Sequence, residues 1–200
     1  MHILTENQIL SPIDVYVLYS KAKGILIEKY DHYNKRTYRN RFKIISPNGI
    51  QTVSIPVSHK KTSPFFKDIR ISYDINWTGR LKNTIRTCYG SAPYFDYFAG
   101  DIFDIFERKY RFLYDLNTAL RIYVFDILQI ETKVDFTTRY IKHYPETITD
   151  IRDKYTPVTP HQSNHPYYIQ VFEYKFGFIP GMSILDYLFN TGTSGFLSGI

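Results

Sequence analysis

Side chains that could do chemistry are densest between Glu28 and Arg41, in the segment EKYDHYNKRTYRNR. The segment combines carboxylate and imidazole groups with three tyrosines and five lysines or arginines in 14 positions. Because imidazole titrates near neutral pH, His32 is a candidate acid–base group, and Glu28 is a candidate carboxylate partner in the same role. A solvent-exposed His32 without a chemical role is the competing interpretation.

Two arginines of this segment are spaced so that together they could bind one anion. If Tyr38–Ile45 forms a strand, its period of two places Arg39 and Arg41 on one face, about 7 Å apart. Two guanidiniums so placed could hold a diphosphate or a carboxylate. Tyr38 and Asn40 then face the other side, so neither face is apolar. A ligand site, a buried ion-pair network and an exposed basic edge would each explain such a strand.

Beyond these arginines, the sequence suggests a wider set of site residues. Trp77, the only tryptophan, could stack on a sugar or a base, or could simply pack at the start of a helix. Cys88 lies on a predicted apolar helix face, which is typical of a core residue rather than a nucleophile. The candidate catalytic residues are Glu28 and His32, and the candidate substrate-binding residues are Tyr33, Lys35, Tyr38, Arg39, Asn40, Arg41, Trp77, Asp101 and Asp186.

Common catalytic signatures are absent from the sequence. It contains no glycine-rich phosphate loop, no GxGxxG, no GxSxG, no HExxH and no CxxC pair. The single cysteine excludes an intramolecular disulfide and any zinc site built from several cysteines. These absences remove the usual nucleotide-hydrolase, dehydrogenase, serine-hydrolase and zinc-protease interpretations. We therefore expect neither a metal nor a cofactor.

The elements that must position these residues are predicted to form an α+β fold. Apolar spacing and turn residues predict strands at 3–8 and 24–29, a hairpin at about 38–56, and a strand at 134–136. They predict helices ending near 21, over 77–89, from 95, over 114–128, and after Ser183. Strands mostly precede helices, which favours an N-terminal, mainly β half packed with a C-terminal, mainly helical half over a regular alternation of parallel units. The length favours a single domain spanning residues 1–200.

Charge is distributed unevenly along the chain. The net charge is +6, and residues 1–100 carry 15 Lys and Arg against 7 Asp and Glu. A local positive field attracts anions such as phosphates, although a solvated basic face would look the same in sequence. No run of about 18 apolar residues predicts a membrane span, and the N-terminus lacks the pattern of a secretory signal. We expect a cytoplasmic protein.

Several segments, in order, resemble the WbqC-like family of bacteria. They are YNKRTYRNR at 33–41, VSIPV at 53–57, Trp77, YGSAPYF at 89–95, YIQVFE at 168–173 and GFIPGMSILD at 177–186. The resemblance implies a protein of surface-polysaccharide (O-antigen) gene clusters and supplies no agreed catalytic set to carry over. Many relatives have a histidine four residues after the tryptophan, where this chain has Leu81. That departure implies an inactive or differently working site, unless Leu81 is simply a helix core residue.

Three functions follow from these observations. The first is a transferase of surface-polysaccharide precursor metabolism that binds an anionic, nucleotide-linked substrate through Arg39 and Arg41. The second is a non-catalytic binding or scaffold protein of the same pathway. The third is single-stranded nucleic-acid binding on aromatics in a basic groove, which a net charge of +6 without RRM or KH signatures supports only weakly. The donor, the acceptor and the oligomeric state are not encoded in any motif.

Overall fold

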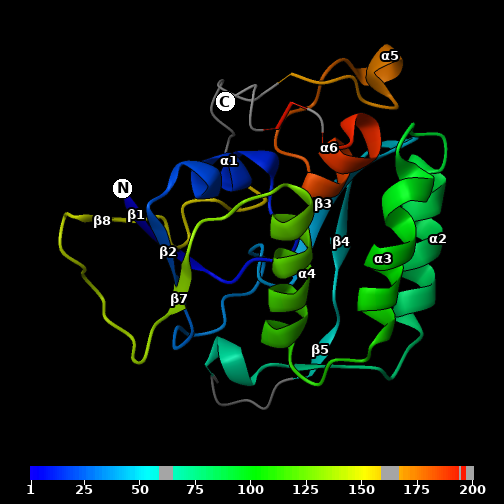
Figure 1. The fold of residues 1–200 in the computed structure, drawn as a ribbon. Coiled ribbons are helices and arrows are strands. Elements are labelled where there is room, and N and C mark those ends of the chain that lie inside the picture. The colour runs from blue at the N-terminus through cyan, green and yellow to red at the C-terminus, as the bar shows by residue number, and fades with distance from the viewer. Residues whose placement is uncertain (59–64, 159–166, 194, 197–200) are drawn as a thin grey trace.

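The computed structural model describes residues 1–58, 65–158, 167–193 and 195–196, and it confirms the predicted α+β fold (Figure 1). The strands are β1 (His2–Glu6), β2 (Gly24–Glu28), β3 (Arg41–Ser46), β4 (Gly49–Ser54), β5 (Val57–Ser58), β6 (Arg70–Ile71), β7 (Val134–Phe136) and β8 (Ile148–Asp150). The helices are α1 (Ile13–Lys21), α2 (Trp77–Tyr89), α3 (Phe95–Glu107), α4 (Leu113–Ile127), α5 (Glu173–Phe176) and α6 (Ile184–Thr191), with a 3-10 turn at Phe66–Asp68. A strand-rich half thus precedes a helical half.

The main sheet is parallel, which the sequence did not predict. Its four strands lie in the order β7-β2-β1-β8, and every neighbouring pair runs parallel. The unit β1-α1-β2 forms its centre, because a parallel pair needs a crossover that a helix can supply. Both outer strands have only three residues and come from the second half of the chain. The sheet therefore joins the two halves.

The predicted hairpin is present, but its first strand begins later than expected. Strands β3 and β4 pair antiparallel from Arg41 with Ser54 to Ser46 with Gly49. Gly49 has a φ of 104°, a value that glycine adopts without a steric penalty. The prediction of a strand from Tyr38 was wrong, because residues 38–40 form a turn in which the Tyr38 carbonyl accepts a hydrogen bond from Ile9 N at 2.8 Å. The period-two argument therefore does not apply to Arg39 and Arg41.

The helical half follows the sequence pattern closely. Asn76 caps α2, since its side chain accepts a hydrogen bond from Gly79 N at 3.0 Å. Ser183 caps α6 in the same way through Leu185 N at 3.3 Å. Cys88 is buried among the core residues, as its place on an apolar face predicted. In Figure 1 the parallel sheet lies on the left, α2 and α3 on the right, and α4 between them.

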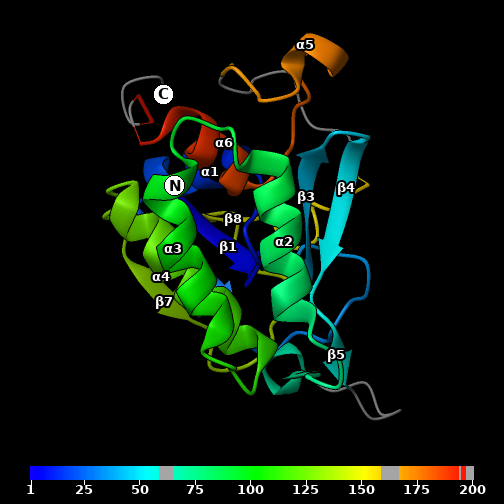
Figure 2. The ribbon, with the colours of Figure 1, turned by 90° about the vertical axis from the view of Figure 1, so that its right-hand side faces the viewer.

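Two views locate the hairpin within these layers. Figure 2 shows the β3-β4 hairpin beside α2, and α2 packs on β3. Helix α4 packs on the 3-10 turn and on α3. In the described part of the chain, no helix combines the length and the apolar character needed to cross a bilayer.

Candidate functional site at the carboxyl edge of the parallel sheet

Polar side chains gather where the strands of the parallel sheet end. The chain passes from β1 to β2 and then to β7 on one side, whereas β8 lies on the other side of β1. In open parallel sheets, ligands bind outside the carboxyl ends of the strands at such a reversal of strand order. Here Glu6 ends β1, Glu28 ends β2 and Asp150 ends β8, so three carboxylates mark this edge.

Arg39 is the first centre of the cluster at this edge. Its side chain is 1% exposed, and its Nε donates to Asp31 Oδ2 at 3.0 Å while its Nη2 also contacts that oxygen. Its Nη1 donates to Asp153 Oδ1 at 2.7 Å and to Thr37 Oγ1 at 3.3 Å. Each nitrogen of the guanidinium therefore has a partner, so Arg39 could grip a phosphate only by breaking an existing ion pair.

Arg152 is the second centre. Its guanidinium donates to both oxygens of Asp150, to Glu28 Oε2 at 3.1 Å, and to two backbone carbonyls. Tyr140 and Tyr144 lie against it, with ring centroids 5.2 and 5.4 Å from Cζ. The other oxygen of Glu28 accepts hydrogen bonds from Tyr30 N at 2.8 Å and from a threonine hydroxyl. Arg152 and Glu28 thus form a saturated structural pair.

The cluster contains more carboxylates than arginines. Five carboxylates, those of Glu6, Glu28, Asp31, Asp150 and Asp153, share two guanidiniums. Burial raises the pKa of Glu6 and of Asp31 above their ordinary values, although Arg39 lowers both. Burial acts on Arg39 in the opposite direction, but the surrounding carboxylates raise its pKa. The excess of negative charge favours retention of a proton at this edge.

A cleft of about 340 Å³ opens onto the cluster. Its lining residues are Asp31, His32, Asn34, Arg39, Tyr140, Asp150, Arg152 and Asp153. The volume is at the lower end of the range for small-molecule sites. His32 is exposed at this cleft and stacks on Phe65, with ring centroids 5.5 Å apart. Within the described ranges, no group of three or more His, Cys, Asp or Glu has the geometry to hold a metal ion.

Asp31 lines this cleft and has one carboxylate oxygen that lacks a hydrogen-bond partner among the described residues. Both of its hydrogen bonds from Arg39 reach Oδ2, and Oδ1 is buried without a hydrogen-bond partner among the described residues. Unpaired buried acceptors are rare in folded proteins, and a catalytic role is one of the explanations for them.

Comparison with known proteins bears on this arrangement. The model of the WbqC-like protein family matches residues 13–157, which is most of the chain. The chain belongs to the WbqC-like family. Membership fits a role in a polysaccharide pathway. No curated protein and no solved structure matches the chain.

The family match includes every residue of the cleft, but it ends before the last two segments of the resemblance, at 168–173 and 177–186. In this WbqC-like chain, those two segments contribute instead to a hydrogen-bond network around Asp186. Asp186 lies buried on α6, where its carboxylate accepts hydrogen bonds from Tyr89 at 2.8 Å, Tyr168 at 2.7 Å and Gln170 at 2.7 Å. The geometry there is that of a buried polar network in the core.

The structure disperses most of the other predicted site residues. Arg41 is half-buried at the start of β3, and its Nε has no hydrogen-bond partner in the described chain. Lys35 is exposed, and Tyr33 stacks on Phe66 with centroids 6.2 Å apart. Asn40 donates to Ile55 O at 3.1 Å. Of these four predicted residues, none lines the cleft beside Arg39.

Three further predicted residues lie on other elements. Tyr38 is fully buried, and its hydroxyl has no partner within the described residues. Asp101 is exposed on α3 and accepts a hydrogen bond from Tyr123 at 3.3 Å. Trp77 starts α2 and lines, together with Leu81, a separate cavity of about 350 Å³ against β4. Leu81 is also a buried core residue, as the helical spacing predicted.

Sequence reasoning missed Asp31, Arg152 and Asp153 as site residues. Asp31 stands next to His32 in the segment with the most functional groups, and that position is the signal that could have identified it. Arg152 and Asp153 follow β8, a strand too short to be predicted. Their partners Glu28 and Arg39 are 124 and 114 residues away in the chain, so no local sequence pattern predicts either contact.

Proposed function

We propose that the protein is a group transferase of bacterial surface-polysaccharide precursor metabolism, and that the carboxyl-edge cleft is its active site. Family membership supports the pathway, and the position of the cleft at the reversal of strand order supports the site. The observation that carries the proposal is Asp31: a carboxylate at the cleft whose pKa is raised by burial and whose Oδ1 has no partner among the described residues.

Asp31 is suited to general-base catalysis. A raised pKa brings a carboxylate closer to the pH at which it can accept and return a proton. In the proposed reaction, an acceptor hydroxyl or amine attacks the electrophilic carbon of the donor. A bond forms between the acceptor and that carbon, and the bond to the leaving group breaks with its electron pair. The acceptor's proton passes to Asp31, and His32, at the same cleft, is a second candidate for proton transfer.

The charge around the cleft suggests how two substrates are arranged. The carboxylate-rich interior is unfavourable for a phosphate, because Arg39 and Arg152 are already paired. An acceptor that is neutral or carries an amine fits this interior better. Lys35 and Arg36 directly follow the cleft residue Asn34 and are exposed. We place the anionic leaving group of a nucleotide-linked donor at these two side chains.

A turnover screen tests the proposal. Nucleotide-sugars are incubated with amine or hydroxyl acceptors, and release of the nucleotide is followed by mass spectrometry. Asp31→Asn keeps the shape of the side chain but lacks the basic oxygen, so turnover should fall by about 100-fold or more. Arg36→Met, on the same segment, should retain turnover and affect mainly the KM. Full turnover by a folded Asp31→Asn variant would refute the role of Asp31.

Absence of turnover would favour the second candidate function. If nucleotide-sugars bind and no acceptor reacts, the non-catalytic binding or scaffold function replaces the transferase. The ion pairs of Arg39 and Arg152 favour this second function, because side chains that are fully paired stabilise the fold around the cleft.

A further inference from the structure

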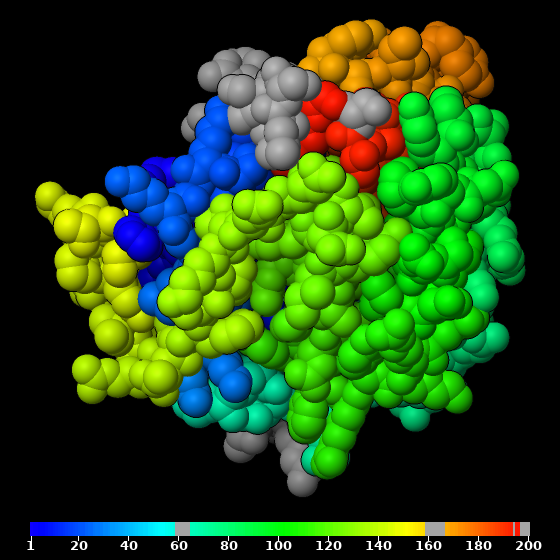
Figure 3. All heavy atoms as spheres, in the orientation of Figure 1, coloured from blue at the N-terminus to red at the C-terminus, as the bar shows by residue number. Residues whose placement is uncertain are grey.

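A second cavity, of about 800 Å³, lies between α4 and β7, outside the carboxyl-edge cleft. Figure 3 shows the surface hollowed between α4 and the segment that leads into β7. The wall is mostly apolar, with Ile122, Phe125, Ile130, Val134 and Phe136 among its residues. We refer to this cavity as the α4–β7 groove.

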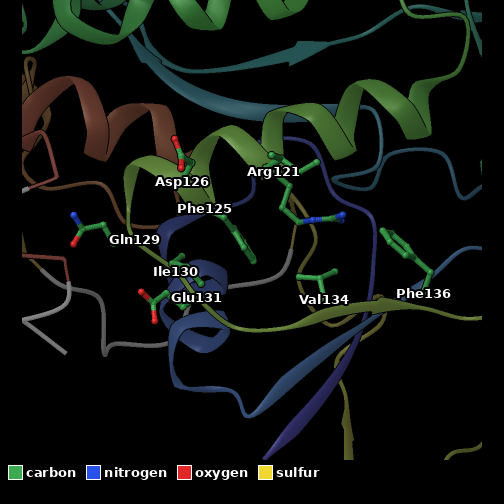
Figure 4. Close-up of a pocket in the computed structure, with 9 residues that line it drawn as sticks. Arg121, Phe125, Asp126, Gln129, Ile130, Glu131, Val134 and Phe136 are labelled. Carbon is green, nitrogen blue, oxygen red and sulfur yellow. The ribbon is translucent and has the colours of Figure 1, made fainter.

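Among the described residues that line this groove, Arg121 is the one cation. Arg121 is 6% exposed, lines the groove, and extends from α4 toward Phe136 (Figure 4). Its Nη1 donates to Asn7 Oδ1 at 2.8 Å, and its Cζ lies 5.8 Å from the centroid of the Phe136 ring. Burial lowers the pKa of Arg121, because a guanidinium that is 6% exposed has lost most of its contact with water.

Arg121 lacks ion pairs of the kind that Arg39 and Arg152 make with carboxylates. Among the residues that the structure describes, no carboxylate lies within 4 Å of it, and Asn7 is its only hydrogen-bond partner. A guanidinium has five N–H donors, and among the described residues only Asn7 accepts from Arg121, so the remaining donors are open to solvent or to a ligand. A buried charge without an ion-pair partner is costly, and a charge of this kind that lines a cavity is a candidate to bind a ligand of opposite charge.

The geometry points to a carboxylate-binding site: we propose that Arg121 anchors the carboxylate of a small ligand whose hydrocarbon body lies along the apolar wall of the α4–β7 groove. The planar fork of Arg121 matches the two oxygens of a carboxylate. Ile122 and Phe136 are 62% and 45% exposed, which leaves apolar surface for the ligand's body to cover.

The remaining lining favours a monoanion over a phosphate. Asp126 and Glu131 also line the groove and are exposed, and Figure 4 shows Glu131 and Gln129 at the end away from Arg121 and Phe136. Because the described lining holds one cation and two carboxylates, a doubly charged phosphate would meet more repulsion than a carboxylate. The site does not depend on the proposed transferase activity, because it rests on other residues.

Binding of matched probes tests this site directly. Phenylbutanoate, the neutral phenylbutanamide and phenylbutylphosphonate are titrated into the full-length protein by calorimetry. We expect phenylbutanoate to bind at least about tenfold more tightly than the amide, since charge-assisted hydrogen bonds are about twice as strong as neutral ones. Equal affinity for acid and amide would overturn the proposal, and tighter binding of the phosphonate would overturn the choice of a carboxylate.

Variants connect the binding to Arg121. Arg121→Gln should weaken phenylbutanoate by about tenfold or more, whereas Arg108→Gln, an exposed arginine after α3, should leave it unchanged. Ile122→Glu changes an exposed position on the groove wall, so it should fold normally and also weaken the acid by repulsion. Unchanged affinity in both Arg121→Gln and Ile122→Glu would show that the probe binds elsewhere.

The stability of variants distinguishes an arginine that binds a ligand from one that holds the fold together. Arg121→Met removes an unpaired charge, so it should lower the denaturation midpoint less than Arg39→Met, which breaks two ion pairs. An equal or larger loss for Arg121→Met would identify Arg121 as a structural residue and would overturn the proposal.

Discussion

Removal of Arg39 should destabilise the protein through the carboxylates that it leaves behind. Arg39 pairs with Asp31, whose side chain is 7% exposed, and it also acts electrostatically on the fully buried Glu6. Its pair with Asp153 contributes less, because the Asp153 side chain is 48% exposed. Breaking a buried pair by removing one partner costs about 3–5 kcal/mol, so we expect Arg39→Met to lower the free energy of unfolding by about that amount.

The cost should depend on pH with a definite sign. Burial raises the folded-state pKa of Glu6 and Asp31, so the folded protein binds more protons than the unfolded chain between the ordinary and the raised values. The stability contributed by these two groups therefore falls as pH rises through that window. Loss of Arg39 raises both pKa values further, so the cost of Arg39→Met should be smaller at about pH 4.5 than at about pH 7.

Urea unfolding at several pH values measures this cost. Arg36→Met, an exposed arginine of the same segment, is the matched control and should change stability by less than about 0.5 kcal/mol. A loss below about 1 kcal/mol for Arg39→Met, or a loss that does not shrink at acidic pH, would refute the view of Arg39 as the charge centre of the cluster.

Two further predictions concern the helical half. Burial raises the pKa of Cys88 to about 11, so a thiol reagent at about pH 8 should label the native protein slowly and the denatured protein rapidly; rapid native labelling would contradict the buried position. Asp186→Ala should cost about 3 kcal/mol or more in denaturant unfolding, because Tyr89, Tyr168 and Gln170 lose their shared acceptor in the core. A cost below about 1 kcal/mol would mean that these donors find other partners.

Local signals explain which elements could be predicted. The helix over Trp77–Tyr89 was predicted with its observed bounds, because Asn76 is a strong capping residue and the apolar spacing of Leu81, Ile85 and Cys88 is helical. The hairpin turn at Gly49 was equally clear, since a positive φ there suits glycine.

Long-range pairing explains what could not be predicted. Strand β7 was predicted at 134–136 with its observed bounds, but its parallel pairing with β2 was not. Strand β8 has only three residues, too few for a periodic pattern, and the partners of both strands lie more than 100 residues earlier in the chain. The alternation around Arg39 suggested a strand, but a turn places Arg39 inward against Asp31 and Asp153. A buried ion-pair network was one of the three interpretations left open for that segment. Only the tertiary contacts distinguish such a network from a site that binds an anion.

The carboxyl-edge cleft can be the active site only if it binds a polysaccharide precursor. Asn34 is exposed, lines this cleft and lies outside the ion-pair network, so Asn34→Trp should fill the cleft without disturbing the fold. Ile50→Trp, at an exposed position of β4 outside the cleft, is the control.

The decisive measurement is a melting scan of both variants and the wild type with a panel of nucleotide-sugars. A ligand at 100 times its Kd stabilises a protein by about 2.7 kcal/mol if it binds only the folded state. We predict that at least one nucleotide-sugar raises the melting temperature of the wild type and of Ile50→Trp, and that Asn34→Trp abolishes the shift. An unchanged shift in Asn34→Trp, or a shift with single-stranded DNA and with no nucleotide-sugar, would contradict the carboxyl-edge cleft as the substrate site.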